Sequence, residues 1–249
     1  MRTLDFTKMQ GLGNDFVLVE GPLSFTRQEI AEICDRRFGI GADGVLAVTR
    51  LDPVRMEYWN ADGSAAEMCG NGLRCVARYV YDRGWVQDRN FAVQTPMGTK
   101  GARILEDTIE VELGRVTVGE ERVIDGNLFL LVDLGNPHAV TFVQDTAGID
   151  VDGIGRSIQG GFESGVNVEF AAMTDSGIRM RVWERGVGET LACGTGMAAA
   201  VAAAGVVHGI TGQVEVDVPG GRATLEMRDG VAWMRGPVAY SFRGSVGER

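Results

Sequence analysis

The stretch Met-Cys-Gly-Asn-Gly at residues 68–72 is repeated, in altered form, as Ala-Cys-Gly-Thr-Gly at residues 192–196. The residues after each copy are apolar on nearly all sides of a helix, and such a helix has to be buried. Each copy therefore places one cysteine, Cys69 or Cys193, at the start of a buried helix. The glycines beside each thiol leave the backbone open to a ligand, and the first N–H groups of a helix attract anions.

The similarity between the two copies extends along the chain. A shift of 124 positions aligns, without a gap, Gly41 with Gly165, Trp59 with Trp183, Cys69 with Cys193, Gly70 with Gly194 and Gly72 with Gly196. Nearby shifts align Gly13-Asn14 with Gly135-Asn136, and Val93 and Pro96 with Val216 and Pro219. A period of this length indicates two homologous domains, because solenoid repeats are much shorter.

Short apolar runs bounded by turn residues predict strands around each glycine-fronted helix. We therefore expect an α+β fold of two homologous, pseudo-symmetric domains, each a curved, mostly antiparallel sheet wrapped around a central helix. The polar stretch 116–125 is the candidate boundary. The predicted N-terminal domain covers residues 1–117 and is joined by the C-terminal segment 238–249. The predicted C-terminal domain covers residues 118–237.

A further helix is predicted near the N-terminus, at residues 28–38. Thr26 is its expected N-cap, and Glu29 completes a capping box. Cys34 and Phe38 fall on the apolar face of this helix. We therefore predict that Cys34 is a thiol of the core, outside any site.

The composition excludes several classes of function. The net charge of −10 and the absence of a basic run argue against a nucleic-acid surface. The apolar run 191–207 is too short and too rich in alanine and glycine to span a membrane. Because the N-terminus lacks a signal-peptide pattern, we expect a cytoplasmic protein whose four cysteines are free thiols.

The spacing of the cysteines and histidines does not predict a metal site. Cys75 follows Cys69 on another side of the same helix, at a spacing that matches no pair of metal ligands. His138 and His208 are the only histidines. We therefore expect no bound metal and a packing role for Cys75.

Two thiols that face each other can invert a stereocentre without a cofactor. A base on one face of a carbon removes its proton while an acid on the other face returns one. Pseudo-twofold symmetry would bring Cys69 and Cys193 together in this way. The helix N-terminus is expected to lower the pKa of each thiol. Nucleophilic catalysis by one cysteine with His138 as base stays open, but it leaves the second cysteine without a role.

Distinctive motifs lie in five stretches of the chain, at residues 11–16, 60–75, 135–138, 165–170 and 184–196. Through these motifs the chain resembles the diaminopimelate epimerase family over essentially its whole length. The resemblance implies an epimerase that needs no pyridoxal phosphate or other cofactor and interconverts LL- and meso-diaminopimelate in lysine and peptidoglycan biosynthesis. It also implies a homodimer, with no nucleic-acid or membrane partner.

The resemblance also assigns roles to residues. Cys69 and Cys193 match the family's two catalytic cysteines. The backbone at Gly70-Asn71 and Gly194-Thr195 would hold the α-carboxylate. The remaining substrate contacts would come from Asn14, Asn60, Asn136, Asn167, Glu184 and Arg185. A weaker expectation is that His138 and Glu184 orient or polarise the thiols.

One position departs from the family pattern. Many relatives carry a glutamine after the Gly-Ala-Asp of the first domain, where this chain has Gly44, so one contact with the substrate is expected to be missing. The alternatives are another racemase of the same fold, acting on proline, hydroxyproline or histidine, a non-catalytic amino acid binding module, or a relative of the phenazine-biosynthesis isomerases. Loss of the cysteines would mark either of the last two, and both cysteines are present.

Overall fold

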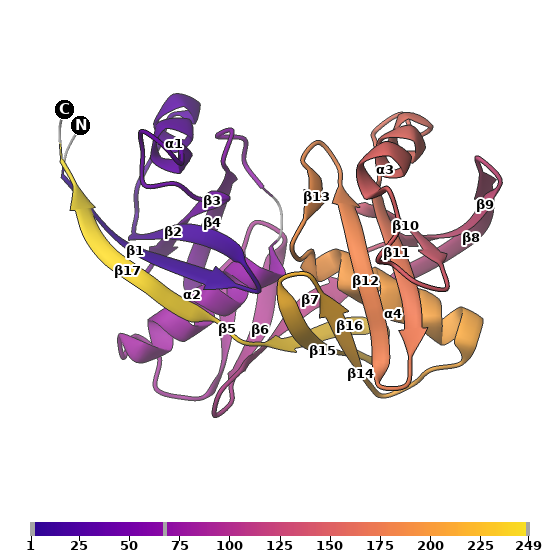
Figure 1. Cartoon of the computed structure of the whole chain (residues 1–249). Helices are drawn as coiled ribbons and strands as arrows, with labels where there is room; N and C mark the ends of the chain where they lie inside the picture. The colour runs from indigo at the N-terminus through magenta and orange to yellow at the C-terminus, as the bar shows by residue number, and fades with distance from the viewer. Residues whose placement is uncertain (1–2, 67–68, 248–249) are drawn as a thin grey trace. The chain divides into compact units, whose positions relative to one another are not determined.

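The computed structural model describes residues 3–66 and 69–247, which form two compact units (Figure 1). Unit 1 lies within residues 1–111 and 236–249, and unit 2 is formed by residues 112–235. The C-terminal strand thus belongs to the same unit as the N-terminus. Within the described ranges, no helix is long and apolar enough to cross a membrane.

Unit 1 is built from one sheet and two helices. Its elements are β1 (Leu4–Gly11), β2 (Asn14–Glu20), α1 (Arg27–Cys34), β3 (Gly44–Thr49), β4 (Val54–Asn60), α2 (Gly70–Asp82), β5 (Asn90–Thr95), β6 (Gly98–Ile104), β7 (Ile109–Arg115) and β17 (Ala239–Val246). Strand β7 begins in unit 1 and continues past residue 111 into unit 2. The strand order in space is β17-β1-β2-β3-β4-β5-β6 with β7 beside β6. Neighbouring strands are antiparallel except at β2–β3 and β4–β5, where α1 and α2 form the connections.

The sheet of unit 1 curves around α2. This helix contacts β1, β2 and β3 and also β6, which lies at the far side of the same sheet. Strand β2 is buried along its centre because α1 and α2 cover opposite faces of the sheet. Val17 and Val19 pack in the cluster that contains Ile30 of α1. Fully covered strands of this kind read as continuous apolar runs.

Unit 2 repeats the order of elements from β1 to β7, with an additional strand before the first of them and a short additional strand, β13 (Gly188–Thr190), before its second helix. Its elements are β8 (Thr117–Ile124), β9 (Asn127–Asp133), β10 (Pro137–Phe142), α3 (Val151–Gly160), β11 (Asn167–Thr174), β12 (Gly177–Glu184), β13, α4 (Gly194–His208), β14 (Gln213–Val218), β15 (Gly221–Arg228) and β16 (Val231–Gly236). Its parallel pairings are β10–β11 and β12–β14, connected through α3 and α4.

The two units therefore repeat one topology. Strands β9 to β12 and β14 to β16 pair in the same parallel and antiparallel sequence as β1 to β7, and β8 pairs with β9 as β17 pairs with β1. Helix α4 contacts β9, β10, β11, β12 and β15, so this sheet also wraps around its helix. The predicted α+β fold of two homologous units, each with a central helix, is confirmed.

Helix α1 is shorter than the sequence predicted. Its N-cap Thr26 and the capping box with Glu29 are present as expected. The helix ends at Cys34, however, because the carboxylate of Asp35 accepts the backbone N–H groups of residues 37 and 38 and turns the chain. The predicted burial of Phe38 is wrong, since its side chain is 72% exposed.

Helix α3 was not predicted because three of its residues are glycines, which weaken a helical pattern. The structure gives two of them a packing reason. A Cβ at Gly155 would lie 2.5 Å from the side chain of Trp183, and a Cβ at Gly153 would lie 2.2 Å from the capping carboxylate of Asp150. Gly155 thus lets α3 pack closely on the sheet of unit 2, and Gly153 leaves room for the N-cap of the helix.

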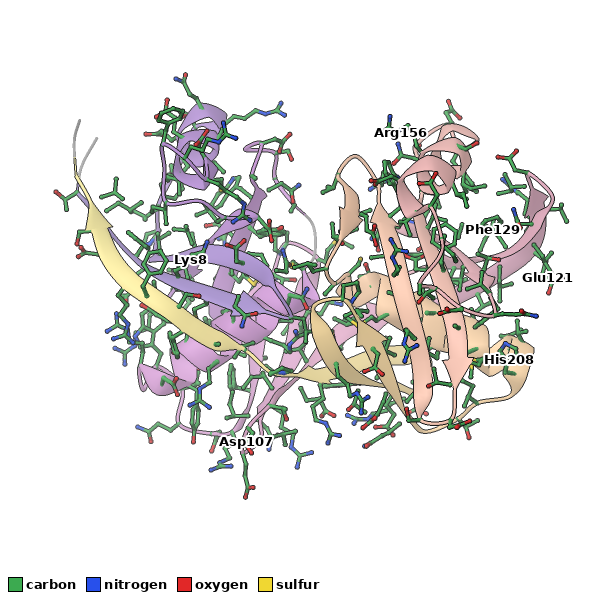
Figure 2. All side chains as sticks on the ribbon, in the orientation of Figure 1. Lys8, Asp107, Glu121, Phe129, Arg156 and His208 are labelled. Carbon is green, nitrogen blue, oxygen red and sulfur yellow. The ribbon has the colours of Figure 1, made fainter. Side chains whose placement is uncertain are left out.

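The polar stretch 116–125 forms most of a strand, β8, where the sequence indicated a boundary. Its charged side chains, including Glu121, point to solvent, whereas Phe129 on the neighbouring strand β9 is fully buried (Figure 2). Most side chains of β8 are exposed and several are charged. The strand therefore lacks the alternation of apolar and polar residues by which strands are identified in a sequence.

Candidate active site

Both cysteines of the repeated stretch are the N-caps of central helices. The sulfur of Cys69 accepts the backbone N–H of Gly72 at 3.3 Å, at the start of α2. The sulfur of Cys193 accepts the backbone N–H of Gly196 at 3.4 Å, at the start of α4. The two thiols therefore occupy equivalent places, one in each unit, beside N–H groups that have no acceptor within an ideal helix.

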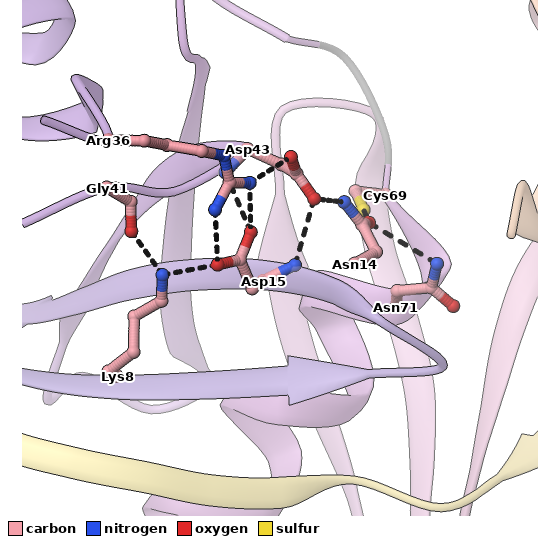
Figure 3. A network of polar contacts seen from close by, with 8 residues as sticks. All are labelled: Lys8, Asn14, Asp15, Arg36, Gly41, Asp43, Cys69 and Asn71. Carbon is pink, nitrogen blue, oxygen red and sulfur yellow. Dashed lines mark hydrogen bonds and ion pairs between the residues drawn. The ribbon is translucent and has the colours of Figure 1, made fainter. Parts of the chain in front are cut away.

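Two asparagines surround the sulfur of Cys69 (Figure 3). The thiol donates to Oδ1 of Asn14 at 3.6 Å, and the side-chain amide of Asn71 donates to the same oxygen at 3.3 Å. Asp43 fixes the orientation of the Asn14 side chain, because Nδ2 of Asn14 donates to the Asp43 carboxylate at 2.7 Å. The carbonyl end of Asn14 must then face the thiol.

A cluster of four charged side chains supports Asn14 in turn (Figure 3). Arg36 bridges Asp15 and Asp43 at 2.7 and 2.8 Å, and the nearly buried Lys8 pairs with Asp15 and with a backbone carbonyl. Burial raises the pKa of Asp15, but the hydrogen bonds from Arg36 and Lys8 outweigh it and hold this pKa at about 2. The cluster was not predicted, because its members are far apart in the sequence.

The depressed pKa of Asp15 predicts acid sensitivity. A carboxyl whose pKa is lower in the folded than in the unfolded chain stabilises the fold above its unfolded pKa, and this contribution disappears as the pH falls through the folded pKa. From the shift of 3.8 to about 2, we expect wild type to lose about 2 kcal/mol more than Asp15→Asn between about pH 5 and pH 2. Urea unfolding at several pH values measures it.

Asp107→Asn, which removes a carboxylate at the outer surface (Figure 2), is the matched control and should follow wild type. Parallel curves for wild type and Asp15→Asn would contradict the assignment.

The surroundings of Cys193 follow the same plan with different residues. Its sulfur lies 3.5 Å from the hydroxyl of Thr195, which accepts the side-chain amide of Asn136 at 3.2 Å. In the repeat, Asn136 is therefore equivalent to Asn14 of unit 1, and Thr195 is equivalent to Asn71. The structure places these predicted residues beside their own cysteine in each unit.

A buried pair of side chains lies behind the first turn of α4. His138 Nδ1 is 2.6 Å from Oε1 of Glu169, and both side chains are fully buried. Glu169 also lies against the helix start, because a Cβ at Gly196 would come within 2.7 Å of Oε1. His138 therefore contacts Glu169, a residue that the sequence did not single out.

The pKa of Cys193 is raised well above its ordinary value, opposite to the effect expected from a helix N-terminus. Burial is the largest cause, followed by the negative charges of Glu184 and Glu169, and the N–H of Gly196 and the hydroxyl of Thr195 offset only part. The prediction of a lowered pKa is wrong for this thiol because desolvation outweighs the partial charge of the helix.

The other predicted substrate residues are held by hydrogen bonds within their own unit. Asn60 donates to the hydroxyl of Ser64 at 3.0 Å. Asn167 donates to the carbonyl of Pro137 and accepts the backbone N–H of Arg185, both at 3.0 Å, so it fixes the turn that carries Arg185. The carboxylate of Glu184 accepts the hydroxyl of Thr190. The exposed Arg185 donates to a backbone carbonyl at 3.2 Å.

Gly44 has no room for a side chain. A Cβ there would lie 2.4 Å from the carbonyl oxygen of Trp59 and 2.6 Å from the ring of Tyr58, both on the neighbouring strand β4. Backbone and ring atoms thus occupy the space that a longer residue would need. The glycine is required by packing in this chain.

The thiols of Cys34 and Cys75 are buried, as expected for core residues. Burial raises the pKa of Cys34 to about 11 and that of Cys75 to about 12. Both thiols are therefore uncharged at neutral pH. In the part of the chain that the structure describes, no group of three or more histidine, cysteine or acidic side chains could hold a metal ion.

Sequence reasoning gave no role to three residues that support the surroundings of the cysteines, namely Asp43, Arg74 and Glu169. Arg74 is a fully buried arginine on α2, and its guanidinium donates to Oδ1 of Asn71 at 2.9 Å. Glu169 had a signal in the sequence, because it is a lone carboxylate among the apolar residues Val168 and Phe170 to Met173 of strand β11. A charge in such a strand indicates a buried partner or a site.

Comparisons with known proteins agree with these features. A sequence model described as diaminopimelate epimerase matches residues 6–119 and 130–241. A diaminopimelate epimerase of Pelotomaculum thermopropionicum is 39% identical over 276 residues, which cover 97% of this chain and 98% of that protein. One of Methanococcus maripaludis is 38% identical over 283 residues, covering 98% and 99%.

Solved structures of lower identity share the fold. A phenazine biosynthesis protein of the PhzF family from Bacillus anthracis has a TM-score of 0.77 at 13% identity and covers 99% of both chains. A hydroxyproline epimerase from Agrobacterium vitis has a TM-score of 0.77 at 14% identity, covering 99% of this chain and 91% of that one. The family match over both units and the two equivalent thiols lead to one conclusion: the chain belongs to the diaminopimelate epimerase family.

Proposed function

We propose that this protein is a cofactor-independent epimerase that interconverts LL- and meso-2,6-diaminopimelate, with Cys69 and Cys193 as its two acid–base groups. The observation that carries the proposal is the pair of equivalent helix N-caps, one thiol in each unit. Family membership and the names of the curated relatives support the substrate. The assignment to lysine and peptidoglycan biosynthesis, the cytoplasmic location and the homodimer are part of this proposal.

The proposed reaction needs one thiol on each face of the α-carbon. One cysteine, as thiolate, removes the α-proton, and the other, as thiol, delivers a proton to the opposite face. We propose that the two units are the two epimerase domains expected at 1–117 with 238–249 and at 118–237, and that each supplies one of these thiols. The duplicated topology supports a division of the work between them.

Negative charge develops on the α-carboxylate when the proton leaves. We propose that the N–H groups at Gly70-Asn71 and Gly194-Thr195, in the first turns of α2 and α4, bind that carboxylate. The partial charge of each helix contributes about 0.3–2 kcal/mol. A direct N–H donor in a closed site contributes about 3–4 kcal/mol, so these hydrogen bonds stabilise the carboxylate more than the helix charge does.

The other contacts would hold the substrate's reacting and distal ends. The residues proposed for this role are Asn14, Asn60, Asn136, Asn167, Glu184 and Arg185. A bidentate arginine with several amides suits a fixed carboxylate and ammonium. Of the two residues proposed to polarise the thiols, Glu184 has the more direct support, because its negative charge acts on Cys193. His138 would act through Glu169, its partner at 2.6 Å.

Incubation with LL-diaminopimelate in deuterated water tests the function. The thiol that returns the proton has exchanged with solvent, so meso product formed early should carry deuterium at one α-carbon while the remaining substrate stays unlabelled. NMR and mass spectrometry of the separated epimers measure this. Product that retains its original proton, or no conversion, would overturn the mechanism.

Proline, hydroxyproline and histidine are the control substrates in the same experiment. Exchange at their α-carbons without conversion of diaminopimelate would assign the chain to a different racemase activity. No exchange with diaminopimelate or with any of these three amino acids would support a binding module.

A further inference from the structure

Arg74 is the fully buried cation in the first half of α2, and the chain makes room for it with two glycines. A Cβ at Gly11 would lie 3.1 Å from its Nη2, and a Cβ at Gly236 would lie 3.3 Å from its Cζ. Arginine is rarely buried to this extent, because taking a charge out of water is costly. Because burying this guanidinium is costly, we expect a nearby group that its positive charge stabilises.

The guanidinium is linked to Cys69 through two side chains. Nη2 of Arg74 donates to Oδ1 of Asn71 at 2.9 Å, and Nδ2 of Asn71 donates at 3.3 Å to Oδ1 of Asn14, the oxygen that the Cys69 thiol contacts. Burial lowers the pKa of Arg74 to about 10, and negative charge on Cys75 and on Cys69 acts in the opposite direction. A thiolate near this guanidinium and the guanidinium itself therefore stabilise each other.

Of these two thiols, only Cys69 can be the thiolate that the Arg74 guanidinium stabilises at neutral pH. Burial raises the pKa of Cys75 to about 12, which keeps it uncharged. Cys69 is partly exposed and is the N-cap of α2, where the N–H of Gly72 donates to its sulfur at 3.3 Å. Helix N-termini and nearby cations are the two features that most often turn a cysteine into a thiolate.

Two further features of the described residues act on the Cys69 thiol. The charged cluster behind Asn14 holds two cations, Lys8 and Arg36, and two carboxylates, Asp15 and Asp43, so its charges balance. Oδ1 of Asn14 favours the protonated thiol, but an S–H group is a weak donor and the contact is 3.6 Å long. A full buried charge acts more strongly than such a contact.

The second unit lacks this cation. The residue of α4 equivalent to Arg74, at the shift of 124 positions, is Ala198. The first turn of α2 lies against Leu46, because a Cβ at Gly72 would come 3.2 Å from its Cδ2. The first turn of α4 lies against the carboxylate of Glu169. Cys193 therefore combines burial with nearby carboxylates, and Cys69 combines partial exposure with a buried cation.

We propose that Arg74 makes Cys69 the thiolate of the free protein, while Cys193 remains a thiol. The catalytic meaning of this assignment rests on the proposed epimerase function. The Cys69 thiolate would take the α-proton of one epimer, breaking C–H and forming S–H. Cys193 would give its proton to the other face, leaving a thiolate. The starting form returns when Cys69 releases its proton to solvent and Cys193 takes one up.

Labelling by iodoacetamide tests the assignment without substrate, because only the thiolate reacts. Rates at each cysteine are measured by peptide mass spectrometry over roughly pH 5 to 10, a range that brackets ordinary cysteine pKa values. In wild type, Cys69 should reach half its maximal rate at a lower pH than Cys193. In Arg74→Met, which keeps the length but loses the charge, the pH of half-maximal labelling of Cys69 should rise by about one unit, so labelling at a pH well below that midpoint should slow about tenfold.

Arg78→Met is the matched control, because Arg78 lies one turn further along α2 and pairs at the surface with Asp82. Its Cys69 profile should equal that of wild type. Titration of Cys193 before Cys69 in wild type, or an unchanged Cys69 profile in folded Arg74→Met, would overturn the inference. If Arg74→Met does not fold, the order of the two thiols in wild type decides.

The labelling and the deuterium experiment fail separately. An inactive protein with an acidic Cys69 would contradict the proposed function alone. An active epimerase in which Cys193 ionises first would contradict this assignment alone.

Discussion

Cys69→Ser and Cys193→Ser should each lower the rate of epimerisation of diaminopimelate by a factor of about 10³, because a positioned acid–base group contributes roughly 10²–10⁴ to a rate. Both variants should still fold. Serine is a favoured N-cap, and its oxygen can accept the N–H of Gly72 or Gly196 in place of sulfur. Coupled assays of kcat with each epimer, together with thermal unfolding, measure the two effects.

Cys34→Ala is the matched control for the cysteine variants. Its thiol is buried in the cluster beside α1 and plays no part in the proposed mechanism. We expect a stability cost of about 1 kcal/mol and unchanged kcat. If either serine variant keeps its activity within tenfold of wild type, that thiol is not an acid–base group of the reaction.

Gly44→Ala should destabilise unit 1 by about 2–4 kcal/mol, a large effect for one methyl group. The new Cβ would lie 2.4 Å from the backbone oxygen of Trp59, so strands β3 and β4 would have to separate locally. Backbone cannot rotate away as a flexible side chain can. Gly44→Gln, with a longer side chain in the same space, should be no better tolerated.

Gly160→Ala makes the same substitution where a Cβ meets open space, at the last residue of α3. It should leave stability unchanged or raise it by up to about 1 kcal/mol, since alanine is the better helix former. Denaturant unfolding of both variants gives the comparison. A Gly44→Ala protein as stable as wild type would mean that the β3–β4 pairing adapts freely.

Features that depend on neighbouring residues could be predicted well. The capping box at Thr26 and the starts of α2 and α4 follow from residues within one turn of each other. The duplication was visible because two copies keep the same spacing of glycine, tryptophan and cysteine. Helix α3 could not be predicted, because its close packing against Trp183 requires a glycine that weakens the helical pattern. Strand β8 could not be predicted, because its exposed charges hide the alternation of apolar and polar residues.

The surroundings of the two thiols could not be predicted from local sequence patterns. Glu169 and His138 come from neighbouring strands, and the cradle of Arg74 is closed by glycines from both ends of the chain, Gly11 and Gly236. Burial also reverses the pKa shift expected for Cys193. Such long-range contacts set the charge and solvation of each sulfur.

The sequence by itself determined the family, the duplicated α+β architecture, and the placement of Cys69 and Cys193 at helix starts, because each rests on short-range spacing and repetition. Only the tertiary structure decided that the two thiols have unlike environments. Unit 1 has Arg74 and Leu46 where unit 2 has Ala198 and Glu169. The effect of Arg74 and Glu169 on the charge of the nearby thiol depends on their burial. A charge acts strongly on its neighbours only once folding has removed it from water.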